Sequence, residues 1–210
     1  MTQPKSSTKG PRIGRAGMSQ QILDAARETL AQDGFAAFGV NAVARAAGCD
    51  KQLIYRYFGG LDGLVAAIGE TLADRVTDGL TQPDPPPASY AALIEALLRR
   101  LFDLLVQDAL VRRIAAWELA DPSPLTLPLA AARSAGLQQW VADMRGNLAA
   151  PAGIDAPAVN ALLIGGVQQL ALAAAAGQPF AGLVLDPAGT ARTQAAIAAL
   201  VHGVYGSAKN

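Results

Sequence analysis

Residues 43–58 have the sequence VARAAGCDKQLIYRYF, in which Gly48 separates two short helical patterns. The apolar residues before this glycine predict one helix over about 41–47. After it, Asp50 is placed to cap a second helix over 51–57, because its carboxylate can accept hydrogen bonds from the free backbone N–H groups of the first turn. The segment therefore predicts two short helices joined by a tight turn.

The second short helix carries side chains suited to contact with nucleic acid. Ile54 and Phe58 lie one turn apart and can anchor the helix, which leaves its polar side chains free to enter a major groove about 12 Å wide. Lysine can bind guanine or phosphate, glutamine can pair with adenine, and tyrosine hydroxyls commonly bind phosphate. The candidates on this helix are Lys51, Gln52, Tyr55 and Arg56.

The rest of the chain is helical in pattern as well. Ala and Leu carry most of its apolar content and aromatic residues make up only 5%, a composition that favours helices. Apart from the short segment 183–185, no alternation typical of a strand persists. We predict an all-α fold of about nine helices. Their expected positions are 19–34, 41–47, 51–57, 61–80, a segment that includes 93–105, 109–120, 125–149, 156–177 and 190–206.

Four prolines between Thr81 and Ala88 mark the clearest boundary in the chain. We expect a disordered basic arm over residues 1–18, a helix-turn-helix domain over 19–60, a connecting helix over 61–80 and a second helical domain over 81–210.

Charge is divided unevenly between these parts, although the net charge is zero. Residues 1–60 carry eight basic and four acidic side chains, a balance of +4, and the remaining 150 residues carry nine and thirteen, a balance of −4. A basic N-terminal part indicates that this part meets a polyanion. Chance is the alternative explanation for so small a difference.

The segment 19–68 resembles the TetR family of regulators. The motifs that carry the resemblance are ILDAA at 22–26, GF at 34–35, VARAAG at 43–48, LIYRYF at 53–58 and Leu64. The resemblance implies a nine-helix fold, a two-fold dimer formed mainly by the last two long helices, and an inducer pocket inside the C-terminal domain. It places Lys51, Tyr55 and Tyr57 where the family contacts DNA, and position 39 where it often contacts phosphate.

The full set of candidate DNA-binding residues combines both arguments and is Lys51, Gln52, Tyr55, Tyr57, Arg56, Arg45, Asn41 and Gly39. For the tyrosines, the alternative is a half-buried packing role with an exposed hydroxyl. For the arginines, the alternative is a solvated surface position.

Four positions depart from the family pattern. Phe38 and Gly39 stand where the family often has Thr or Ser, which removes a hydroxyl contact to phosphate. Asp50 replaces a usual Ser or Thr, and Leu61 replaces a frequent Lys. The basic arm can offset these losses by following the DNA backbone or the minor groove.

The second domain contains candidates for a ligand pocket on apolar helical faces, with core packing as the alternative. These candidates are Phe102, Trp117, Trp140 and Met144, with Arg113, Glu118, Gln138 and Gln139 as polar groups. Because acidic residues outnumber basic ones in this domain, we expect an uncharged or cationic apolar ligand.

Small residues on the last two long helices permit close helix packing and favour a dimer interface there. Internal core is the competing interpretation. The expected interface residues are Leu162, Gly166, Leu170, Ile197 and Leu200.

Other classes of protein are disfavoured. A single cysteine, Cys49, excludes an internal disulfide framework, and the single histidine, His202, has no metal-ligand partners at useful spacing. No carboxylate pair at a spacing of three or four residues lies on an expected buried helix face, so the sequence does not point to an enzyme, and we expect no metal or cofactor. A redox role for Cys49 is a minor alternative. The uncharged segment 156–185 is interrupted by polar residues and prolines, and its most apolar part is shorter than the roughly 20 residues of a membrane span.

We therefore predict a cytoplasmic, homodimeric repressor that binds a palindromic operator in double-stranded DNA and is released by a small-molecule inducer. Its two recognition helices would lie roughly 34–36 Å apart, the spacing of successive major grooves on one face of DNA. The alternative is a ligand-sensing dimer of the same fold that lacks sequence-specific DNA binding.

Overall fold

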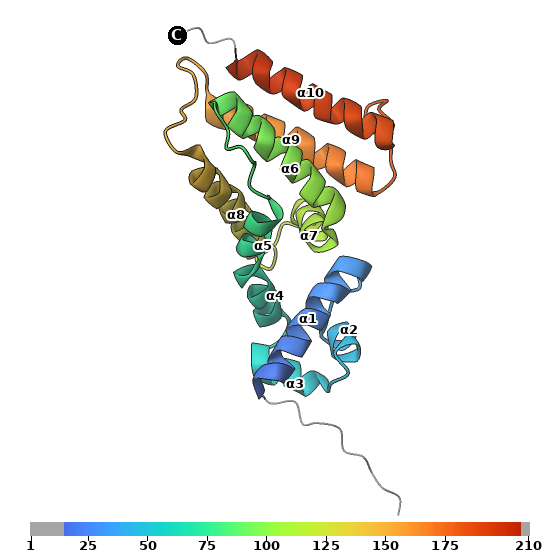
Figure 1. Ribbon diagram of the computed structural model, residues 1–210. Helices are drawn as coiled ribbons and strands as arrows, with labels where there is room; N and C mark the ends of the chain where they lie inside the picture. Colours follow the sequence, from blue (N-terminus) through green and yellow to red (C-terminus); the bar gives the residue numbers. More distant parts are fainter. Residues whose placement is uncertain (1–14, 207–210) are drawn as a thin grey trace, which may run out of the picture. The chain divides into compact units, whose positions relative to one another are not determined.

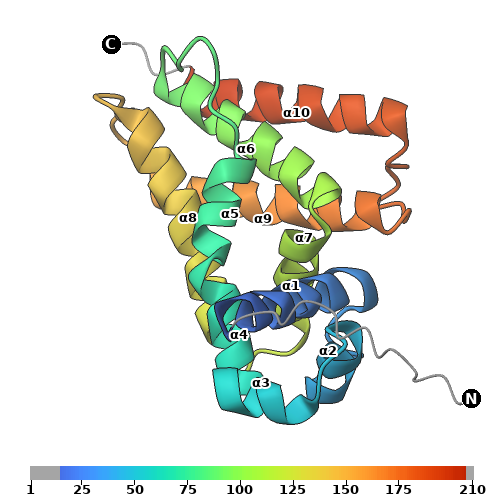
Figure 2. The ribbon, with the colours of Figure 1, turned by 60° about the horizontal axis from the view of Figure 1, so that its bottom comes forward.

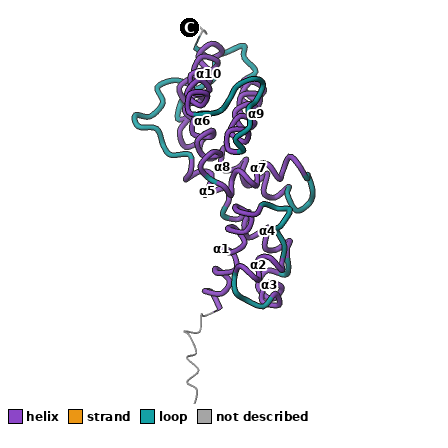
Figure 3. Tube along the Cα trace, turned by 90° about the vertical axis from the view of Figure 1, so that its right-hand side faces the viewer, coloured by secondary structure: helices purple, strands orange, loops and turns teal. Residues whose placement is uncertain are grey.

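The computed structural model describes residues 15–206, whose regular elements are all helices (Figures 1 and 3). The helices are α1 (Arg15–Asp33), α2 (Val40–Ala46), α3 (Lys51–Phe58), α4 (Leu61–Glu70), α5 (Leu72–Gly79), α6 (Tyr90–Gln107), α7 (Ala109–Ala120), α8 (Leu127–Arg145), α9 (Ala156–Ala175) and α10 (Pro187–Tyr205). The all-α prediction is confirmed. The described segment around 183–185 forms one isolated bridge between Phe180 and Leu183 instead of a strand.

Two helix boundaries differ from the prediction. Helix α1 begins at Arg15 and not at Ser19, because extending a nucleated helix costs little even where no apolar position marks it. Residues 15–18 of the predicted arm are therefore helical, and residues 1–14 of it lie outside the described residues.

The predicted connecting helix over 61–80 is two helices, α4 and α5, which meet at Thr71. The Thr71 hydroxyl donates to the Ile68 carbonyl at 3.3 Å. The backbone N–H of Thr71 donates to the same carbonyl over three residues instead of four. Such local bonds compete with the regular helical pattern. Counted as one, α4 and α5 bring the ten helices of the described segment to the nine expected.

The chain divides into two compact units, one up to Leu64 and one from Val65 onward. In the first unit α1 packs on α2, and α2 packs on α3. The core of this unit comes from one face of α1 together with the short helices. Its fully buried side chains include Ile22, Ala26, Leu30, Val43 and Ile54.

In the second unit α6 is the central helix, and α9 and α10 pack along it (Figure 1). The Ser89 hydroxyl caps its start by accepting from the Ala92 backbone N–H at 3.1 Å. Because α7 and α8 also contact it, its apolar side chains are buried on more than one side, as its wide apolar stripe predicts. The buried residues of α6 include Leu93, Ile94, Leu97, Leu98, Leu101, Phe102, Leu104 and Leu105.

Helix α8 lies against α5, as Figure 2 shows. The contact is close at Gly136, where a Cβ would lie 2.6 Å from the Ala73 carbonyl oxygen and 2.8 Å from Val76 Cβ. The Thr77 hydroxyl donates to the Gly136 carbonyl at 3.2 Å. Only a residue without a side chain lets the two backbones approach this far.

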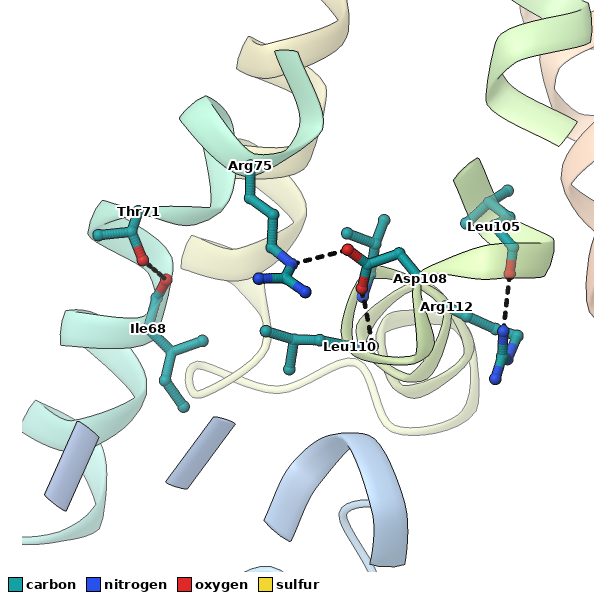
Figure 4. A network of polar contacts seen from close by, with 8 residues as sticks. Ile68, Thr71, Arg75, Leu105, Asp108, Leu110 and Arg112 are labelled. Atoms are coloured by element: carbon teal, nitrogen blue, oxygen red, sulfur yellow. Dashed lines mark hydrogen bonds and ion pairs between the residues drawn. The ribbon is translucent and has the colours of Figure 1, made fainter. Parts of the chain in front are cut away.

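Helix α5 is also tied to the start of α7 (Figure 4). The Arg75 guanidinium Nε lies 2.8 Å from Asp108 Oδ2. The other oxygen of Asp108 accepts from the backbone N–H groups of Leu110 and Val111, each at 3.0 Å. One carboxylate therefore caps α7 and pairs with a cation on α5.

Candidate nucleic-acid interface and ligand cavity

Helix α3 has a defined start and a defined end, which fixes its eight residues in register. The Asp50 carboxylate accepts from the Gln52 backbone N–H at 2.8 Å, as the sequence predicts. At the other end Gly59 adopts a φ of 77° and donates its N–H to the Tyr55 carbonyl at 2.9 Å. A left-handed residue in this place satisfies a carbonyl that the helix leaves unpaired.

The turn before α3 is held by bonds from two directions. Gly48 has a φ of 61°, and the Cys49 N–H donates to the Ala44 carbonyl at 3.0 Å. From α1, the Gln21 side chain donates to the Ala47 carbonyl at 2.9 Å. Gln21 was not predicted from the sequence, because no local signal shows that α1 passes the turn.

The anchoring of α3 leaves one continuous polar arc exposed. Ile54 is fully buried, and Lys51, Gln52, Tyr55 and Arg56 are all exposed. At 3.6 residues per turn these four side chains span about 140° of the helix circumference. Tyr55, with 55% of its surface exposed, is not a core residue.

The other candidates for DNA contact lie on or beside α2 and α3. Tyr57 is half-buried, and the guanidinium carbon of Arg56 lies 5.6 Å from its ring centre, within cation–π range. Arg45 and Asn41 are exposed on α2. Gly39 is the N-cap of α2 and supplies no side-chain hydrogen bond.

Cys49 is a half-buried free cysteine beside this surface. Burial raises the pKa of its thiol, and the neighbouring Asp50 carboxylate raises that pKa further. A thiol with a raised pKa forms little of the reactive thiolate near neutral pH, which argues against the redox role.

In the second unit, helices α6, α8 and α9 surround a cavity of about 660 Å³. Its walls are mainly apolar and include Leu97 of α6, Leu137 and Val141 of α8, and Ile164 of α9. The polar side chains that line it are Arg133, Ser134, Gln138, Arg145 and Gln168. This volume and this composition are typical of small-molecule sites.

A buried ion pair stands at one end of this cavity. Arg133 Nη2 lies 2.6 Å from Glu118 Oε2, and Arg133 Nε donates to the same oxygen at 3.0 Å. Arg133 Nη1 donates to Gln168 Oε1 at 3.2 Å. The three side chains join α7, α8 and α9 through one guanidinium.

Comparison with known proteins agrees with this architecture. Residues 22–68 match the tetR family of bacterial regulatory proteins. The similarity to the TetR family therefore covers the segment that contains α2, α3 and most of α1.

One relative of this chain is the HTH-type transcriptional regulator AlkX of Mycobacterium tuberculosis, 30% identical over 129 residues. The alignment spans 61% of this chain and 56% of AlkX. A protein described as a TetR-family transcriptional regulator from a Rhodococcus species has the same fold, with a TM-score of 0.66 and 17% identity over 90% of this chain and 98% of that one. A transcriptional regulator from Streptomyces coelicolor gives a TM-score of 0.57 at 27% identity, with 90% and 98% covered.

The five residues predicted for the ligand pocket do not line the cavity between α6, α8 and α9. Phe102, Trp117 and Trp140 are buried in the core, Met144 is half-buried, and Arg113 is exposed on α7. Burial of the three aromatic residues favours the packing alternative, and their role in a ligand site stays a prediction. Their helical faces point toward neighbouring helices, a choice that amphipathic pattern alone does not specify.

Among the predicted polar groups, Gln138 does line the cavity. The Gln139 side-chain amide instead donates to the Asp143 carboxylate at 2.8 Å on the surface. Glu118 forms an ion pair with Arg133, which lines the cavity. Four polar residues of the cavity, Arg133, Ser134, Arg145 and Gln168, were not predicted from the sequence. For the three on α8, the one available signal is the spacing of polar residues along that helix, which is also that of an ordinary solvated face.

The five residues predicted for the dimer interface line one groove between α9 and α10, about 560 Å³ in volume. Leu162 is 78% exposed and Leu200 is 57% exposed. Gly166 is exposed, Leu170 is half-buried, and Ile197 is buried. In a single chain this groove leaves two large leucine side chains in water.

Helix α9 is long and apolar enough to cross a membrane by length and composition, although only 22% of its apolar window is buried inside the structure. Its buried side chains include Val167 and Ala171, and the helix packs on α6. Elsewhere on the described surface, His202 Nε2 lies 2.7 Å from Glu95 Oε2. Residues 15–206 contain no cluster of His, Cys, Asp and Glu that could hold a metal ion.

Proposed function

We propose that this protein is a cytoplasmic, DNA-binding transcriptional regulator of the TetR family, a homodimeric repressor that a small, largely apolar ligand releases from a palindromic operator. The observation that carries the proposal is the exposed arc on α3. Lys51, Gln52 and Tyr55 stand on a helix that is capped at both ends and anchored by Ile54. An α-helix fits the major groove, where these side chain types bind bases and phosphates.

Dimerisation supplies the second half of the binding surface. A two-fold pair would place two α3 helices roughly 34–36 Å apart, on successive major grooves of a palindromic site. The apolar groove between α9 and α10 supports this arrangement, because a second copy would remove Leu162 and Leu200 from water. The same contact accounts for the apolar character of α9 without a membrane.

The cavity supports control by a ligand. Helix α8 forms one wall of it, and the opposite side of the same helix packs on α5 at Gly136. Because that contact is close, a ligand that favours one position of α8 also favours one position of α5. A ligand shifts such an equilibrium by its differential affinity for the two states.

The experiment is a binding assay with DNA from directly upstream of the protein's own gene, at several salt concentrations and with random DNA as competitor. We expect binding that survives the competitor and falls steeply with salt. Lys51→Ala should weaken it and reduce the slope of log affinity against log salt by about 1. The matched control is Arg113→Ala, which removes an exposed cation from α7 and should leave both quantities unchanged.

One observation favours a second candidate, the ligand sensor without an operator. Gly39, at the start of α2, offers no side chain to a phosphate and makes no side-chain cap. Equal, weak binding of the native dimer to all DNA, including a wider set of upstream regions, would contradict the repressor and support this sensor.

A further inference from the structure

The polar groups around the cavity between α6, α8 and α9 specify the charge and the shape of a ligand. We propose that the cavity binds an elongated apolar carboxylic acid, with its carboxylate on Arg145 and a neutral oxygen at its other end on Gln168. The inference rests on the proposed function and adds the chemical class of the inducer. It reverses the charge that the acidic composition of the domain predicts.

The cavity is elongated because one face of α8 runs along it. Arg133, Leu137, Val141 and Arg145 follow one another at intervals of four residues and all line the cavity. Arg133 and Arg145 are twelve residues apart, a distance of about 18 Å along the helix axis. The side chains between them are apolar, so the long middle part of a ligand must be apolar as well.

The charge of Arg133 is already balanced. The Glu118 carboxylate receives three hydrogen bonds from its guanidinium, at 2.6 Å, 3.0 Å and 3.3 Å, and both side chains are mostly buried. An anion at this end would meet the Glu118 carboxylate, and unpaired buried charge is costly. The ligand end that lies here is therefore neutral.

Gln168 supplies a free donor at the same end. Its residue surface is 8% exposed, and its side-chain oxygen is used by Arg133. Its amino group makes no hydrogen bond to the described residues, although the side chain lines the cavity. Because this donor lines the cavity, a ligand hydroxyl or carbonyl oxygen can accept a hydrogen bond from it.

Arg145, at the other end, has no carboxylate partner in the described part of the chain. Its Nε donates to the Leu148 carbonyl at 2.8 Å, which leaves the two terminal NH₂ groups available to a carboxylate. The nearest acid on its helix, Asp143, lies about 200° around the axis and accepts from Gln139. None of the described residues that line the cavity is acidic.

The test uses four straight-chain probes of equal length, each below its micelle concentration: dodecanoate, ω-hydroxydodecanoate, dodecanol and dodecylamine. Binding to the native dimer is measured by calorimetry without DNA. We expect dodecanoate to bind about tenfold more tightly than dodecanol. This ratio of dissociation constants corresponds to the free energy of one hydrogen bond to a charged group. Dodecylamine should bind most weakly, and ω-hydroxydodecanoate should bind most tightly.

The variants separate the two ends. Arg145→Gln should abolish the advantage of the acid over the alcohol, and Arg145→Lys should restore part of it. Gln168→Leu should abolish only the added affinity of the hydroxy acid. Arg113→Gln, which changes an exposed cation outside the cavity, should change nothing, and circular dichroism checks that each variant is folded.

The inference is overturned if the amine binds as tightly as the acid, if Arg145→Gln keeps the preference, or if none of the probes binds. If the protein binds its operator but none of the probes, the proposed ligand class is wrong and the proposed repressor function stands. Probe binding by a protein that binds no operator removes the proposed repressor and leaves the cavity assignment intact.

Discussion

Asp50 has two effects at the turn between α2 and α3. Its carboxylate caps α3 by accepting from the Gln52 N–H, and its charge raises the pKa of the Cys49 thiol beyond the effect of burial. The hydrogen bond needs only an oxygen, whereas the pKa effect needs the charge. Substitutions can therefore separate them.

We expect Asp50→Ala to lower the free energy of unfolding by about 1 kcal/mol, the usual cost of a lost N-cap. Asp50→Ser keeps a capping oxygen and removes the charge, so stability should stay near that of the native protein while the pKa of Cys49 falls. Urea denaturation measures the first effect, and the pH dependence of alkylation by iodoacetamide measures the second.

The raised pKa also predicts the direction of a stability change. Since the thiol ionises less readily in the folded protein, its contribution is present below the ordinary value of 9.0 and is lost as the pH rises through the folded pKa. Cys49→Ala serves as the reference, because it lacks this titration. An alkylation midpoint at or below 9.0 in the native protein would contradict the assignment.

At the scale of elements, the closest fit is between α5 and α8. Gly136 lies against the backbone of Ala73 and the side chain of Val76, whereas a methyl group at Gly165 of α9 would meet no other atom within 4 Å. Both glycines lie within helices and share the same backbone preference. A difference between their alanine variants therefore reports the difference in their surroundings.

Gly136→Ala should destabilise the protein by about 1–3 kcal/mol, the usual cost of overpacking. Gly165→Ala is the matched control and should leave stability unchanged or raise it by up to about 1 kcal/mol, since alanine favours helices. Thermal and urea denaturation measure both. Equal changes in stability for the two variants would contradict this prediction, because they would show that α5 and α8 can separate to admit a methyl group at little cost.

The whole molecule is completed, in our proposal, by a second copy on the groove between α9 and α10. We expect Leu162→Asp or Leu200→Asp to convert the dimer to monomer, because a charge in an apolar interface is costly. Leu119→Asp is the matched control: Leu119 is 64% exposed but lies on α7. Sedimentation velocity measures the oligomeric state.

In this experiment all three variants must remain helical by circular dichroism. A native protein that sediments as a monomer, or a Leu162→Asp variant that stays dimeric, would contradict the interface. Association of the native protein with lipid vesicles would instead support a membrane role for the apolar face of α9.

The amino-acid sequence by itself determined the helices, the turn at Gly48, the cap at Asp50 and the exposed arc of α3. These features depend on interactions within about four residues, such as caps, turn conformations and helical periodicity. The division at Thr71 was missed because one side-chain hydrogen bond to Ile68 leaves almost no trace in the pattern.

Only the tertiary structure decided which buried residues form core and which line the cavity. Trp140 and Arg133 both lie on α8, yet the tryptophan is core and the arginine faces the cavity. The charge that a ligand meets was decided in the same way. The domain is acidic as a whole, but packing places a cavity along the face of α8 that carries Arg133 and Arg145, and it pairs only Arg133 with a carboxylate. Electrostatic interaction depends on distance in space, and the order of residues along the chain does not contain that distance.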